Sequence, residues 1–247
     1  MMPKPNGTQF KFARTPQSRP ASAVARSKLL PPGWNDSVPL PCDQHFLLDT
    51  GIYHNLACQS EEVGKAIATV LDGHEYNSTI ADEVGRPDPI SPLASCRWIK
   101  KHMTDANTAA CHRTNNDSKV RDEVTKVRNE LIADAQARAI ARGVDPTSVS
   151  TNTEKAKHGG EAELIWQANR HEPKAYILTD DGGASAVARV HEVATGHFLH
   201  VLRQAVRDEA ITLTVALEAS SIVQDSGYGV PPTAEITRTD SEEWLSS

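Results

Sequence analysis

The sequence FLLDTG at residues 46–51 decides the fold, because a short apolar run ends there in an acidic residue, Asp49. Such a run, flanked by polar residues, predicts a buried strand at about residues 45–49. A second run of this kind, at 175–179, leads into an acidic turn that contains Asp180 and Asp181. Strands that are apolar throughout are typical of parallel sheets covered by helices on both faces. The two runs therefore predict buried parallel strands whose carboxyl ends deliver side chains into a cleft.

Helical patterns separate these runs. Apolar residues recur at helical spacing, or helix caps and stops are recognisable, in the ranges 52–56, 60–72, 118–142, 161–170, 184–192 and 199–206. Two further segments, 79–84 and 197–201, are expected to begin as short strands and to continue as helices. This alternation predicts an α/β fold: a three-layer sandwich with a central, mainly parallel sheet, to which a helical insertion and loose termini are attached.

The two ends of the chain differ in composition from its middle. Eight prolines lie among the first 41 residues, which excludes a long helix or a central strand there. We therefore expect a disordered arm at 1–41, a folded domain at 42–223 and a polar tail at 224–247. The arm carries six basic residues and one acidic residue, whereas the whole chain has a net charge of −6. A basic arm on an acidic body suits contact with a polyanion by the arm and cation binding by the body.

The four cysteines show no CxxC spacing, and no apolar signal segment is evident near residue 1. We therefore expect reduced thiols and a cytoplasmic location. No apolar run reaches the roughly 18 to 20 residues that a membrane-spanning helix needs, so a membrane role is not expected.

Acidic residues stand at the points where ligands bind in an α/β fold. Asp49 and Asp181 follow the two predicted strands, and in parallel sheets ligands bind beyond the carboxyl ends of the strands. Glu83 and Glu161 belong to helical patterns between them. Clustered carboxylates raise one another's pKa unless a cation lies among them. Carboxylate oxygens are the ligands that Mg²⁺ and Mn²⁺ prefer, and such ions support phosphodiester hydrolysis by activating water and stabilising the leaving oxygen.

These motifs, in this order, resemble the PIN-domain nucleases, a family that includes the VapC-type toxins of toxin–antitoxin pairs. LLDTGIY resembles the opening strand with the first metal-binding acid, Asp49, and TIADEV the segment with the second acid, Glu83. GEAELIWQA is similar to the helix that carries the third acid, Glu161, and ILTDD to the turn that presents the last acid, Asp181. The resemblance implies a PIN-like fold in which these four residues hold metal and support catalysis.

The resemblance covers about residues 45–90 and 158–220. Asp49 and Glu161 are 112 positions apart, far more than in compact family members, so 91–157 is expected to be a helical insertion. This spacing makes the alignment of Glu83 the weakest of the four. Alternates lie beside three of the acids: Asp82 beside Glu83, Glu163 near Glu161, and Asp180 beside Asp181.

Each of these residues also has a purely structural interpretation. Asp49 can cap the following helix, Asp181 can belong to an ordinary Asp-Gly turn, and Glu161 can be a first-turn acid that complements the helix dipole. Thr50 and Thr179 can position a carboxylate or simply favour the local backbone. Three histidines, His191, His197 and His200, lack a partnered nucleophile motif and are interpreted as structural residues.

The leading hypothesis is a Mg²⁺- or Mn²⁺-dependent endoribonuclease of PIN type, the toxin half of a toxin–antitoxin pair by family resemblance. Its partners would be an RNA substrate, an antitoxin protein and, through the insertion, a second copy of the chain. The alternative is a non-catalytic PIN-like module that binds RNA or protein, because a fold does not guarantee an activity.

Overall fold

The computed structural model describes residues 40, 45–86, 89–105, 109–112, 118–148, 158–226, 242, 245 and 246. Within these ranges the strands are short and lie in one sheet: β1 (Phe46–Leu48), β2 (His74–Asn77), β3 (Ala109–His112), β4 (Tyr176–Leu178) and β5 (Thr195–Gly196). Their order is β3-β2-β1-β4-β5, and every neighbouring pair is parallel. The predicted α/β class and the parallel direction of the two apolar runs are confirmed, and the structure shows in addition that these two strands are neighbours.

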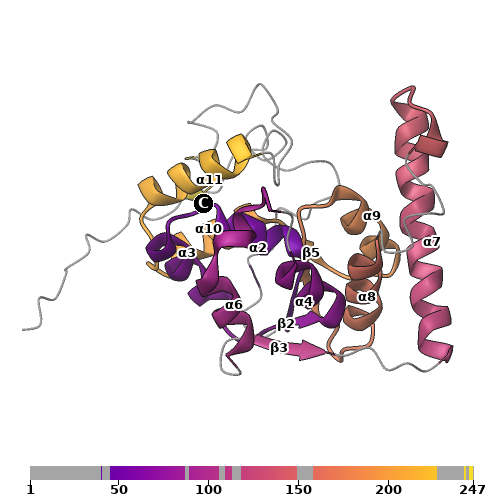
Figure 1. The fold of residues 1–247 in the computed structure, drawn as a ribbon, viewed down its shortest axis with the longest axis horizontal. Coiled ribbons are helices and arrows are strands. Elements are labelled where there is room, and N and C mark those ends of the chain that lie inside the picture. Colours follow the sequence, from indigo (N-terminus) through magenta and orange to yellow (C-terminus); the bar gives the residue numbers. More distant parts are fainter. Residues whose placement is uncertain are drawn as a thin grey trace, which may run out of the picture.

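Helices connect the strands and cover both faces of the sheet (Figure 1). They are α2 (Thr50–Ala57), α3 (Glu61–Ala68), α4 (Ser78–Gly85), α5 (Pro92–Ser95), α6 (Arg97–Thr104), α7 (Ser118–Ala141), α8 (Gly159–Ala168), α9 (Gly182–Val190), α10 (Phe198–Arg207) and α11 (Leu213–Ser226). Two 3₁₀ turns follow α3 and α7, at Thr69–Leu71 and Pro146–Ser148.

Alternate residues of β2 show how the layers are arranged. The His74 ring bonds to Tyr53 on α2, and the Tyr76 hydroxyl donates to a carbonyl of α6. On the opposite face, Asn77 donates to the Gly160 carbonyl of α8. Because side chains alternate between the faces of a strand, α2 and α6 lie on one side of the sheet and α8 on the other. The predicted three-layer sandwich is therefore observed.

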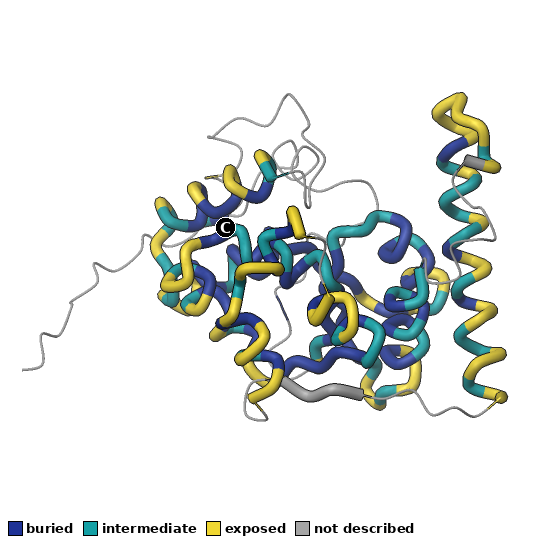
Figure 2. Tube along the Cα trace, in the orientation of Figure 1, coloured by how far each residue is buried: buried dark blue, intermediate teal, exposed yellow. Residues whose placement is uncertain are grey.

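The core lies between these layers, and α7 stands outside them. Figure 2 shows burial concentrated around the sheet, whereas α7 is exposed along most of its length. Among the described residues of α7, Val127, Leu131 and Ala139 are buried, and this stripe faces α8 and α9. The long helix predicted at 118–142 is thus confirmed, and it docks on the body of the protein.

The segment 91–157, expected to be a helical insertion, is only partly separate from the sheet. Its first part forms α5, α6 and β3, and β3 pairs with β2 along four residues. Of the described residues in this segment, only 118–148, which include α7, lie outside the α/β layers. The prediction failed at β3 because a short strand at the edge of a sheet leaves little periodic signal in the sequence.

Three expected boundaries also differ from the structure. The strand expected at the start of 79–84 is β2, which begins five residues earlier at His74, and α4 begins at Ser78 with Asn77 as its N-cap. The strand expected within 197–201 is β5, and α10 begins directly after His197. At the other end, α11 continues to Ser226 and Leu245 is buried, so the stretch 224–247 contributes to the core. The arm at 1–41, except for Leu40, lies outside the described residues.

Candidate metal centre

Asp49 lies at the carboxyl end of β1, where the chain turns into α2. One carboxylate oxygen accepts the Thr50 backbone N–H at 2.7 Å, and the other accepts the Thr179 hydroxyl at 2.7 Å. The Asp49 backbone N–H donates to the Leu178 carbonyl, which joins the ends of β1 and β4. Asp49 is only 7 % exposed. It is therefore a helix cap, as its structural interpretation proposed, but it is also a buried carboxylate with few compensating partners.

Glu161 enters the same region from the first turn of α8. Its carboxylate is close enough to Asp49 and to Glu83 to raise the pKa of both carboxyls. His158, immediately before α8, has a left-handed backbone (φ 62°) and places its Nδ1 atom 3.8 Å from the Glu161 Oε1 atom. One ligand atom each from His158, Glu161 and Asp181 lie within 4.8 Å of one another. These residues form a group that can hold a metal ion.

Glu83 approaches from α4, on the side opposite α9. The Thr50 hydroxyl donates a hydrogen bond to its carboxylate, so Thr50 and Thr179 both position acids of the cluster. Glu83 retains solvent exposure, and partial burial of its carboxyl raises its pKa. The least secure of the four predicted acids therefore does lie beside the others.

Asp181 closes the arrangement from the turn after β4. Its backbone N–H donates to the Thr179 hydroxyl at 3.1 Å, and its carboxylate accepts the Gly183 N–H at 2.6 Å. Asp181 thus caps α9. The Thr179 hydroxyl, which donates to Asp49 and accepts from Asp181, connects the two acids that follow the strands.

The acids are crowded, and their pKa values reflect it. Burial raises the pKa of the Asp49 carboxyl well above its usual value, and the Glu161 carboxylate raises it further. Hydrogen bonds from Thr179 and Thr50 act in the opposite direction but do not cancel the rise. For Glu83 burial is again the main cause, followed among the raising effects by Glu161 and Glu163. A divalent cation among these groups would remove the repulsion, which is the electrostatic signature of a carboxylate metal site.

The alternate acids have other contacts. The Asp180 side chain is buried and accepts hydrogen bonds from Asn55 and from the Phe198 N–H, and it lies 3.0 Å from the His197 ring nitrogen. It therefore fixes the start of α10. Glu163 accepts the Thr79 hydroxyl at 3.1 Å and lies at the edge of the cluster. Asp82 is exposed, and no interaction in the described part of the chain draws it into the group.

Two residues near the acids were not expected from the sequence. His158 directly precedes the Gly159-Gly160 pair that opens α8, and its position before an acidic first turn was the only available signal. Arg138 comes from α7 and places its guanidinium 4.0 Å from the Asp181 carboxylate, while it also pairs with Asp134 at 2.8 Å. A Cβ atom on Gly183 would lie 2.0 Å from the Arg138 side chain, so glycine at this position makes room for the arginine.

The remaining histidines agree with their structural interpretation. His197 and His200 cap the start of α10 through reciprocal hydrogen bonds, and His191 pairs with Glu130 of α7 at 2.6 Å.

Comparison of the chain with protein-family models, with curated proteins and with solved structures found no match. The PIN-like resemblance therefore stays a prediction. Among the residues described, no helix is long and apolar enough to cross a membrane.

Proposed function

We propose that the chain is a Mg²⁺- or Mn²⁺-dependent endoribonuclease that hydrolyses RNA phosphodiester bonds. The observation that carries the proposal is the convergence of acids from four separate segments at the carboxyl ends of β1 and β4. Glu161 and Glu83 raise the pKa of Asp49, Glu161 also raises the pKa of Glu83, and Asp181 lies within ligand distance of Glu161. Such a group costs stability unless a cation compensates it, so a metal-binding role accounts for its presence.

Each residue has a role within this proposal. Asp49 and Glu161 would be the inner ligands, because Glu161 raises the pKa of Asp49 more than Glu83 does, with Asp181 and Glu83 completing the oxygen set. Thr179 and Thr50 hold the carboxylates of Asp49 and Glu83 in place, and the Thr179 hydroxyl also accepts the backbone N–H of Asp181. When bound, Mg²⁺ or Mn²⁺ would supply an activated water and charge stabilisation for the leaving oxygen.

The surface beside the cluster suits a polyanionic substrate. Helix α7 docks against α8, which carries Glu161, and against α9, which Asp181 caps. Four basic residues on α7 or just after it are exposed: Lys119, Arg121, Lys126 and Arg142. Lysine and arginine bind phosphates independently of sequence. These residues would position the RNA backbone, while the acids would act on a single phosphate.

The second candidate, a non-catalytic binding module, is favoured by one contact. Arg138 lies within 4.0 Å of Asp181 and partly compensates its charge without a metal ion. A toxin–antitoxin role, in which a partner protein places a basic side chain among the acids, rests on the family resemblance. In this chain the basic side chain already comes from its own helix α7.

The experiment that tests the proposal is cleavage of a mixed panel of RNA and single-stranded DNA in Mg²⁺, Mn²⁺ or EDTA. The wild type is compared with Asp49→Asn and Asp181→Asn variants, and with Glu192→Gln, whose side chain is 88 % exposed and remote from the cluster. Metal-dependent RNA cleavage that only the two site variants lose would support the proposal. A folded wild type without cleavage in any condition would favour the binding module, and equal cleavage of DNA would overturn the assignment to RNA.

A further inference from the structure

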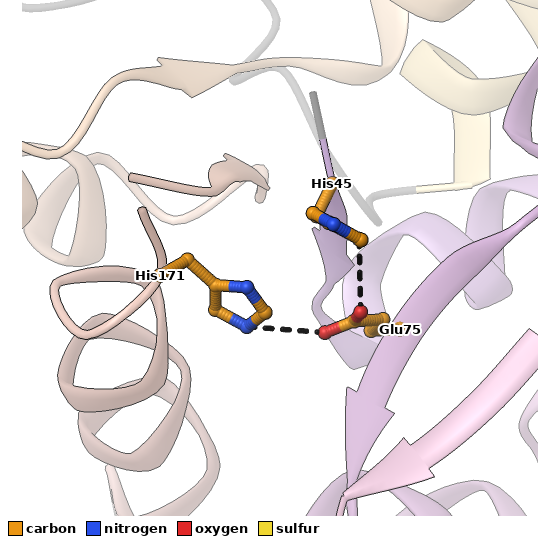
Figure 3. A group of neighbouring side chains, drawn as sticks. All are labelled: His45, Glu75 and His171. Carbon is orange, nitrogen blue, oxygen red and sulfur yellow. Dashed lines mark ion pairs between the residues drawn. The ribbon is translucent and has the colours of Figure 1, made fainter. Parts of the chain in front are cut away.

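A second group of potential metal ligands lies at the opposite end of the sheet. His45 directly precedes β1, Glu75 is the second residue of β2, and His171 belongs to the turn between α8 and β4 (Figure 3). The group therefore lies toward the amino ends of β1 and β4, whereas Asp49 follows the carboxyl end of β1. At about 3.3 Å per residue, the four positions from His45 to Asp49 separate the two groups by about 13 Å.

The three side chains converge on one point. The His45 Nδ1 atom lies 3.0 Å from one Glu75 oxygen, and the His171 Nε2 atom lies 3.2 Å from the other. The two imidazole rings are 5.2 Å apart between centroids and are tilted by 39°. One ligand atom from each residue falls within 4.8 Å of the others. Figure 3 shows the two histidines approaching the carboxylate from different sides, His45 from above and His171 from the left.

These distances are close to those of a metal coordination sphere. Zinc binds imidazole nitrogen and carboxylate oxygen at about 2.0 to 2.2 Å, so two ligands at a tetrahedral angle are about 3.4 Å apart. The observed separations between nitrogen and oxygen atoms differ from this value by a few tenths of an ångström. Small side-chain movements would place an ion between the three groups, with no change in the backbone.

The ligand types select the metal. Two imidazoles and one carboxylate suit Zn²⁺ and related transition ions, whereas Mg²⁺ and Ca²⁺ prefer oxygen ligands. The Glu75 side chain is only 9 % exposed, while that of His45 is 57 % exposed. The site would therefore have a buried anionic ligand, Glu75, and would be open to solvent on the side of His45. A water molecule can enter there and complete a four-coordinate site.

From this geometry we infer that His45, Glu75 and His171 form a second metal site, which takes Zn²⁺ or a similar transition ion with water as a further ligand. The site joins three segments that are distant in the sequence: the entry to β1, strand β2 and the end of the α8 region. Strand β1 leads to Asp49, and the first turn of α8 carries Glu161. An ion at this second site would therefore stabilise β1 and α8, two of the elements that hold the acidic cluster. Its role is that of a structural clamp.

The test is direct binding of Zn²⁺ and Co²⁺ by the full chain. A Glu161→Gln background is used, because His158, Glu161 and Asp181 form the other group that can take a metal. We expect one Zn²⁺ per chain by calorimetry, visible absorption bands from bound Co²⁺, and a melting temperature that rises by about 5 to 10 °C at a hundredfold excess over the dissociation constant. Mg²⁺ should produce none of these effects at the same concentration.

Three variants and one control decide the outcome. His45→Gln, His171→Gln and Glu75→Gln should each weaken Zn²⁺ binding at least about tenfold and change the Co²⁺ spectrum. His45 is mostly exposed, so its variant keeps the proposal testable if Glu75→Gln fails to fold. His191→Gln is the matched control, because it removes a histidine from a histidine–glutamate pair that has no second imidazole. Absence of binding, or binding that survives His45→Gln and His171→Gln, would overturn the proposal.

Because the readouts are binding and melting temperature in a background without Glu161, the result does not depend on nuclease activity. A chain that binds Zn²⁺ but cleaves no RNA would support the second site and contradict the proposed function. A chain that cleaves RNA but binds no Zn²⁺ would do the reverse.

Discussion

The two ends of the sheet gather ionisable residues of opposite character. At the carboxyl ends of β1 and β4, four carboxylates cluster with one imidazole, and burial raises the pKa of Asp49 and Glu83. At the amino ends, two imidazoles hold one carboxylate, Glu75, between them. The first group is short of positive charge, whereas the second has donors that satisfy its anion. The comparison teaches that one small sheet can present a site for a hard cation at one end and a site for a transition ion at the other.

The largest expected effect is that two variants lose different metal ions. Glu161→Gln should reduce Mn²⁺ binding and metal-dependent cleavage by about 100-fold or more, because it removes a central ligand. Glu75→Gln should leave both unchanged while it abolishes the Zn²⁺-dependent rise in melting temperature. Calorimetric titration of each variant with each ion checks this. Loss of both ions in either variant would show that the two ends are not independent.

A second prediction concerns the opposite face of β2, where His74 is buried. Burial lowers the pKa of His74 to about 4, whereas an unfolded histidine titrates near 6.5. The unfolded state therefore binds more protons between these values, and stability falls as the pH is lowered from 6.5 to 4. The expected loss is about 3 kcal/mol, complete near the folded pKa.

Urea unfolding across this pH range, in EDTA, measures the effect of His74. His74→Gln should flatten the dependence, and the His191→Gln variant should retain it. Equal slopes in the wild type and in His74→Gln would show that another group carries the acid sensitivity. The ionisable groups on the Glu75 face of β2 would then have to be tested as the source of the acid sensitivity.

A smaller effect is expected when the charge of Asp49 is removed. Because its folded pKa is raised, the metal-free protein gains stability as the pH falls through that pKa, and the charged form costs stability above it. Asp49→Asn keeps an acceptor for the Thr50 N–H and removes the charge. We expect it to stabilise the metal-free chain at neutral pH by about 1 kcal/mol, while it abolishes metal binding.

Urea unfolding of the wild type and of Asp49→Asn, with EDTA and with Mn²⁺, checks the Asp49 prediction. In Mn²⁺ the order of stabilities should reverse, because only the wild type gains from the ion. Destabilisation by Asp49→Asn in EDTA would mean that the carboxylate is already compensated, and would weaken the argument for a cation.

The smallest predicted effect is at Arg138. Its guanidinium lies 4.0 Å from Asp181 and is partly exposed, so it competes with a cation only weakly. Arg138→Gln should raise the affinity for Mn²⁺ about two- to fivefold, measured by calorimetry, and should not affect Zn²⁺ binding at the amino ends. Arg128→Gln on the same helix is the control. A decrease in Mn²⁺ affinity would instead assign Arg138 a supporting role in the site.

Much of the acidic cluster could be predicted from local sequence. The apolar runs before Asp49 and Asp181 identify strands, since three consecutive apolar residues leave a clear signal even in short strands. The periodic residues of α7 identify the longest helix in the same way. The convergence of Glu83 with Glu161 was expected only through the family resemblance, because no local pattern determines how α4 and α8 approach one another.

The site at the amino ends shows where local patterns stop being informative. Strand β2 reads His-Glu-Tyr-Asn, and nothing in this polar sequence indicates burial on both faces. The residues are buried because each polar group finds a partner elsewhere in the chain: His74 in Tyr53, Glu75 in His45 and His171, and Asn77 in Ile80 and Gly160. Except for Ile80, these partners are more than 20 residues away, so the strand cannot be recognised before the fold is known.

The sequence by itself therefore determined the α/β class, the buried parallel strands β1 and β4 and the acids that follow these strands, because each depends on apolar runs or on residues directly after them. The tertiary structure alone decided that β3 extends the sheet, that Arg138 reaches Asp181 and that His45, Glu75 and His171 meet. The physical reason is that burial of polar side chains depends on partners distant in sequence, whereas burial of apolar side chains is encoded in their own spacing.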